Sequence, residues 1–125
     1  MTFAETLYSY LITYPGLVAL VAARVYPTKL PQEPTLPAVT YQRVSDVPEY
    51  SHDPGGSHAL RVQVTCWAAT YAAAEAVAVE VVSAADGWHA AMGGAAFVEN
   101  MIDLSNPETG VYQVGIDVMF EGITL

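Results

Sequence analysis

Apolar and polar residues alternate one by one along residues 58–67. Leu60 and Val62 occupy one side of this pattern, and Arg61 and Gln63 occupy the other. Successive side chains of a strand point to opposite faces, so a period of two predicts a strand with one buried face. We therefore expect a half-buried strand here.

The period changes to about 3.6 residues directly after this strand. Thr70 can cap a helix N-terminus with its hydroxyl group, and Glu75 suits the positive end of the helix dipole. The change of period predicts an amphipathic helix that packs on the sheet. Its apolar positions are Tyr71, Ala74, Val77, Ala78, Val81 and Ala85.

The preceding residues predict two short helices, a connector and another strand. Pro15 and Gly16 separate the helices, because proline removes a backbone donor and glycine permits a sharp turn. The predicted segments are a helix at Phe3–Tyr14, a helix at Leu17–Ala23, a short extended piece at Arg24–Pro27, an extended proline-rich connector at Lys29–Pro37 and a strand at Ala38–Val44.

The segment Ser45–Ser57 has the composition of a long loop, with Pro48, Pro54 and a Gly-Gly pair. An irregular connection of this length between two strands often serves a function or binds a partner. The last third of the chain predicts a connector at Ala84–Gly94, a strand at Ala95–Leu104, a turn at Ser105–Gly110 and a strand at Val111–Phe120.

These elements predict one α+β domain over residues 1–125, with a mainly antiparallel sheet of about four strands and helices packed on one face. In the last strand the same alternation predicts which residues are buried. They are Tyr112, Val114, Ile116, Val118 and Phe120.

The composition is apolar and acidic. Of 125 residues, 53% are hydrophobic, and only four are Lys or Arg, so the net charge is −9. Binding to a nucleic-acid backbone needs clustered basic residues, which this chain does not supply. An acidic surface does allow DNA to slide past without sticking, because like charges repel.

Targeting signals are not apparent. The single cysteine, Cys66, excludes an internal disulfide. Met1–Glu5 lacks the basic region of a signal peptide, and the apolar run Leu17–Ala23 is far shorter than a membrane span. We expect a soluble protein made inside the cell, without a membrane partner.

The residues that could carry chemistry favour neither catalysis nor metal binding. His52, Asp53 and His58 surround a Gly-Gly spacer, which does not hold ligands in a fixed geometry. Cys66 falls on the apolar side of its strand, where a thiol acts as a small core residue. Paired carboxylates four residues apart in the last two strands would be about 13 Å from each other, too far to share a reaction. We expect no catalytic residue, no metal and no cofactor.

The scarce basic residues, the acidic loop and Trp67 are the candidates for contacts with other proteins. Each arginine forms either an intrachain ion pair or a pair with the acidic loop of another subunit. Trp67 lies on the polar side of its strand, so it packs either against something outside the sheet or under the domain's own loop. The full candidate set is Asp46, Glu49, Tyr50, His52, Asp53, Arg24, Arg43, Arg61 and Trp67.

Several short motifs follow one another in a fixed order. They are Leu7…Leu11…Pro15-Gly16-Leu17, Arg24-Val25-Tyr26-Pro27, Leu30-Pro31-Gln32, Tyr41-Gln42-Arg43-Val44-Ser45, Trp67-Ala68-Ala69-Thr70-Tyr71 and Glu108-Thr109-Gly110-Val111-Tyr112. Each motif is weak alone. Their order and spacing over nearly the whole chain resemble the tail completion family of tailed bacteriophages, also called tail-to-head joining or tail terminator proteins.

The resemblance implies a structural protein that forms a hexameric ring at the head-proximal end of the tail. The ring would end tube growth and contact the tail tube protein and the head-connector or stopper protein. DNA would pass through the bore without specific binding. Because Asp46, Glu49 and Asp53 cluster on the longest predicted loop, we expect them at a subunit interface or at the bore. The family has no catalytic residues, and the expected location is the virion, after assembly in the host cytoplasm.

Two other roles stay open. The first is another structural role in the same particle, either a head-closure or neck ring or a minor tail-tube subunit. The second is a small-molecule-binding α+β domain that forms dimers, which predicts a closed pocket.

Overall fold

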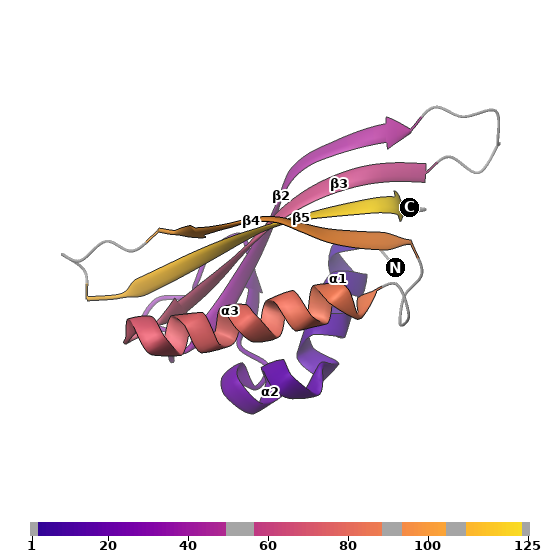
Figure 1. Ribbon diagram of the computed structural model, residues 1–125. Coiled ribbons are helices and arrows are strands. Elements are labelled where there is room, and N and C mark those ends of the chain that lie inside the picture. The colour runs from indigo at the N-terminus through magenta and orange to yellow at the C-terminus, as the bar shows by residue number, and fades with distance from the viewer. Residues whose placement is uncertain (1–2, 50–56, 89–93, 105–109, 124–125) are drawn as a thin grey trace.

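The computed structural model describes residues 3–49, 57–88, 94–104 and 110–123, in which five strands form one sheet (Figure 1). Their spatial order is β1-β2-β3-β5-β4. β1 runs parallel to β2, and the other neighbouring pairs are antiparallel. The strands are β1 (Val25–Pro27), β2 (Ala38–Glu49), β3 (Ser57–Ala68), β4 (Ala95–Asp103) and β5 (Tyr112–Ile123).

Three helices lie on one face of this sheet: α1 (Phe3–Thr13), α2 (Pro15–Val21) and α3 (Tyr71–Asp86) (Figure 1). The α+β class and the mainly antiparallel sheet are therefore confirmed. The sheet has one strand more than predicted, because β1 is only three residues long and was expected as an extended piece outside the sheet.

The predicted start of the long helix is also confirmed. The Thr70 hydroxyl accepts a hydrogen bond from the backbone N–H of Ala73, at 3.2 Å, and so satisfies one of the free donors of the first turn. α3 contacts β3, β4 and β5. The buried stripe of this helix contains Ala74, Val77, Ala78, Val81, Ala84 and Ala85.

The core lies between the sheet and the helices, and alternate residues of the central strands fill it. An aromatic cluster closes one end, where Trp88 makes edge-on contacts with Phe3, Tyr10 and Phe120. The Tyr10 hydroxyl donates a hydrogen bond to the Ala84 carbonyl at 2.6 Å, so α1 is tied to α3. The buried strand residues are Val39, Tyr41, Leu60, Val62, Val64, Cys66, Val114, Ile116, Val118 and Phe120.

The loop prediction for Ser45–Ser57 is wrong at both ends. β2 continues to Glu49 and β3 begins at Ser57, so the two strands pair beyond the predicted boundaries. The composition of the β2 extension is typical of a loop, because the segment carries polar residues and Pro48. Proline is tolerated in an edge strand, where its missing N–H breaks no ladder bond. β5 likewise continues past Phe120, to Ile123.

The first two helices are shifted relative to the prediction. α1 ends at Thr13, and α2 begins at Pro15, where proline occupies the first helical turn and removes only a donor that has no partner there. Within the described ranges, no helix is long and apolar enough to cross a membrane.

Candidate functional site

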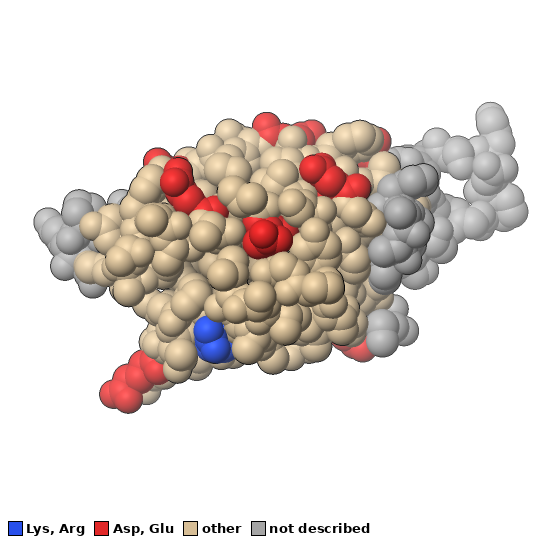
Figure 2. Space-filling model, turned by 60° about the horizontal axis from the view of Figure 1, so that its bottom comes forward, with Lys and Arg blue, Asp and Glu red and all other residues tan. Residues whose placement is uncertain are grey.

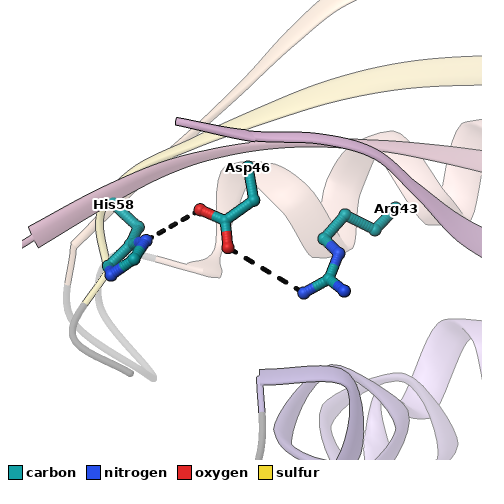
Figure 3. Close-up of polar contacts among 3 residues, drawn as sticks. All are labelled: Arg43, Asp46 and His58. Atoms are coloured by element: carbon teal, nitrogen blue, oxygen red, sulfur yellow. Dashed lines mark hydrogen bonds and ion pairs between the residues drawn. The ribbon is translucent and has the colours of Figure 1, made fainter. Parts of the chain in front are cut away.

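Arg43, Asp46 and His58 form a polar chain on the side of the sheet that faces the helices (Figure 3). His58 Nδ1 donates a hydrogen bond to one carboxylate oxygen of Asp46 at 2.7 Å. The other oxygen lies 3.9 Å from the Arg43 guanidinium. Arg43 and Asp46 are two of the interface candidates predicted from the sequence, and the structure brings these two together.

A β-bulge makes this arrangement possible. Residues three apart in a regular strand point to opposite faces, so Arg43 and Asp46 would be separated by the sheet. The register of β2 against β3 shifts between Arg43 and Ser45, which inserts one extra residue. Both side chains therefore point to the same face. The period-two pattern of the sequence gave no sign of this shift.

Arg61 makes an ion pair on the opposite face. Its Nη2 lies 2.8 Å from Oε2 of Glu99, and both side chains are about two-fifths exposed. The pair links β3 to β4 across β5, which lies between them. An exposed pair of this kind contributes at most about 1 kcal/mol.

Arg24 binds backbone carbonyls of its own chain. Its Nε donates to the Pro37 carbonyl at 2.9 Å, and its Nη2 donates to the Leu20 carbonyl at 3.3 Å. These bonds hold the end of the proline-rich connector against the end of α2. The described contacts of Arg24 thus support the fold.

Trp67 lies on the face of the sheet that no described helix covers. Its indole Nε1 donates a hydrogen bond to the Thr40 hydroxyl at 2.9 Å, across from β3 to β2. Thr40 is only 4% exposed. The indole N–H is thus bonded to the neighbouring strand, and the expected packing of Trp67 against an external protein or the domain's own loop stays a prediction.

The remaining candidates fall outside the described part of the chain. The backbone of Glu49 ends β2, but its side chain is not described. Tyr50, His52 and Asp53 lie outside the described residues altogether. Their assignment to an interface or a bore stays a prediction.

Neither the buried Cys66 thiol nor the exposed Tyr71 hydroxyl is suited to nucleophilic chemistry at neutral pH. Burial raises the pKa of the Cys66 thiol to about 12, so the reactive thiolate is scarce at neutral pH. The hydrogen bond from the Tyr71 hydroxyl to Asp103 likewise raises the pKa of Tyr71 to about 12. Among the residues that the structure describes, no three metal-ligating side chains gather into a site.

An open cleft of about 740 Å³ lies where α1, β1, β2 and β3 meet. Phe3, Leu7, Pro27 and Val62 give it apolar walls, and Arg43 lies at its edge. Its lining comes from four elements that are distant in sequence. No local pattern therefore predicted it.

The charged residues on the outer surface of the helical layer are mainly acidic. Figure 2 shows scattered carboxylates and little basic surface on this side of the molecule. α3 contributes Glu75, Glu80 and Asp86, and no basic residue. This surface would repel a nucleic-acid backbone.

Comparisons with known proteins find both a matching family and a matching fold. A family model described as "Tail completion protein gp17" matches residues 5–120. A chain in the solved structure titled "Virion of native gene transfer agent (GTA) particle" has the same fold, with a TM-score of 0.66 and 18% sequence identity. The similarity covers 91% of this chain and 89% of that one. No curated protein matches the chain.

The family match extends over nearly all the elements described above, from α1 to β5. The chain therefore belongs to the tail completion protein gp17 family and is a structural protein of the phage tail.

Proposed function

We propose that this protein, as a single domain over residues 1–125, caps the head-proximal end of the tail tube as a ring. The ring ends tube growth and offers a docking face to the head connector or stopper protein. The observation that carries this proposal is the family match over residues 5–120. The shared fold with a chain of a gene transfer agent virion supports it.

The charge of the chain fits the passage of DNA. Each copy carries a net charge of −9, and a closed ring multiplies this charge around one bore. Phosphates that pass through the bore are repelled and do not adhere, because so few basic groups are present. We propose that the ring is a hexamer that assembles in the host cytoplasm and remains in the virion.

The proposal is tested with tails from a phage in which the gene for this protein is deleted. Such tails should have tubes of uncontrolled length that do not attach to heads. Added purified protein should stop tube growth and restore attachment, with six copies per tail by quantitative mass spectrometry. Tubes of normal length without the protein, or copies stacked along the whole tube, would instead support the neck-ring or tube-subunit role.

A further inference from the structure

The sheet has two free edges that differ in sequence and lie on opposite sides of the molecule. β4 is the last strand in the sheet order, and β1 pairs with β2 only as far as Tyr41. Within the described ranges, no strand pairs with the outer side of β4 or, beyond Tyr41, with the side of β2 that faces away from β3. An unpaired edge offers backbone donors and acceptors to another chain.

The strand directions allow these two edges to join. β2, β3, β5 and β4 alternate in direction across the sheet, so β4 runs antiparallel to β2. A rotation about an axis roughly along the strands keeps those directions. It therefore places β4 of one copy antiparallel to β2 of the next, which is a head-to-tail contact that closes into a ring.

The register shows which side chains would meet. Tyr41, Val64, Ile116 and Met101 form one row across the sheet. β1 occupies the edge at Tyr41, so Arg43 is the next residue of β2 on the same face and the first on the free edge. A stagger of about two residues, as closed sheets require, brings Met101 of one copy opposite Arg43 of the next.

The cleft provides a place for the Met101 side chain. Met101 is 48% exposed although it lies on the face of the sheet that the helices cover. The cleft opens beside the free edge of β2, with apolar walls from Phe3, Leu7 and Val62. An incoming strand would place alternate side chains in it, as in β-strand addition.

One exposed cation on the free edge of β2 can meet the acidic strand β4. Arg43 is the basic residue of β2, which also carries the acids Asp46 and Glu49. β4 carries Glu99 and Asp103 and no basic residue. Arg43 is 62% exposed and lies at a long 3.9 Å from Asp46, so its guanidinium can bind a further carboxylate.

The geometry points to a second copy of this chain as the occupant of the cleft: β4 of one copy adds to β2 of the next, with Met101 in the cleft beside Arg43. This inference rests on the proposed ring, and it identifies the surfaces that join the copies. It requires no change in the fold of the single chain.

The test measures capping of tail tubes by R43E, by Met101→Lys and by the double variant. Arg43→Glu replaces the cation at the junction by a carboxylate that faces the acidic strand β4, and Met101→Lys places a cation beside Arg43. Each single change should lower the apparent capping affinity at least about tenfold, or about 1.4 kcal/mol. The double variant should recover at least half of this loss on a logarithmic scale, because lysine then faces glutamate.

A matched variant controls for the loss of exposed apolar surface and the gain of a cation. Val79→Lys replaces another exposed apolar residue, on α3 and away from both edges. It should cap tubes as the unaltered protein does. Circular dichroism and thermal unfolding of every variant verify that the monomer is folded.

The outcomes separate this inference from the proposed function. If the unaltered protein caps tubes and both single variants cap equally well, these edges do not join the copies, and the ring proposal stands. The inference is also overturned if the capping affinity of the double variant is lowered by the product of the two single-variant losses, because the two residues then act independently. If the unaltered protein does not cap tubes, the ring proposal itself fails.

Discussion

The two faces of the sheet differ in what covers them. On the face toward the helices, Leu60, Cys66 and Ile116 are fully buried in an apolar layer. No described helix lies on the other face, where the Trp67–Thr40 hydrogen bond and the Arg61–Glu99 ion pair join neighbouring side chains (Figure 1). Stability is therefore concentrated on one side, and the other side and the edges can vary or bind partners.

The largest effect should come from the covered face. Ile116→Ala removes a fully buried side chain from the central strand β5 and leaves a cavity, so we expect the free energy of unfolding to fall by about 2–5 kcal/mol. Urea denaturation measures this change. Met119→Ala, on the same strand with its side chain toward the bare face, should cost much less. Equal losses would contradict the asymmetry.

The Trp67–Thr40 hydrogen bond should show a smaller effect. Thr40→Val keeps the shape of the side chain but removes the acceptor of the indole N–H, so we expect a loss of about 1 kcal/mol. Trp67→Phe and the double variant complete a thermodynamic cycle in urea denaturation. A coupling energy near zero would mean that the bond does not contribute to stability.

The ion pair on the bare face should contribute least to stability. Arg61→Ala breaks the contact with Glu99. Both side chains are about two-fifths exposed, so we expect the free energy of unfolding to fall by less than about 1 kcal/mol. The loss should shrink further in 1 M salt, because mobile ions screen exposed charges. A loss that persists undiminished at high salt would indicate packing of the arginine side chain and not its charge.

The hydrogen bond between Tyr71 of α3 and Asp103 of β4 can be tested by its dependence on pH. Asp103 raises the pKa of Tyr71 to about 12, chiefly through the hydrogen bond from the tyrosine hydroxyl. The contribution of this bond to the free energy of unfolding is complete below the ordinary tyrosine pKa of about 10 and is lost as pH rises through 12. Spectrophotometric titration of Asp103→Asn should show one tyrosine with a lower pKa. An unchanged titration curve would exclude the bond in solution.

The period of the sequence was enough to predict the covered face. A period of two at residues 58–67 and a period of 3.6 after Thr70 gave β3 and α3, because burial of one face imposes the same period on composition. The cap at Thr70 was equally local, since a hydroxyl reaches a backbone N–H three residues away. These elements needed no knowledge of distant residues.

The sequence was less informative where pairing between strands decides the structure. β1 is too short to show a pattern, and it becomes a strand only because β2 lies beside it. The extension of β2 to Glu49 likewise follows from its pairing with β3, against a loop-like composition. A ladder of backbone hydrogen bonds does not depend on side-chain type, so composition does not reveal it.

The sequence by itself thus determined the class of fold, the acidic character and the family resemblance, because each depends on residue identity and local spacing. Only the tertiary structure decided that Arg43 meets Asp46, that Trp67 meets Thr40 and that a cleft opens beside the free edge of β2. Those contacts join residues from different strands. They depend on strand register, on a one-residue bulge and on which edges remain unpaired, and the chain sets these only when it packs as a whole.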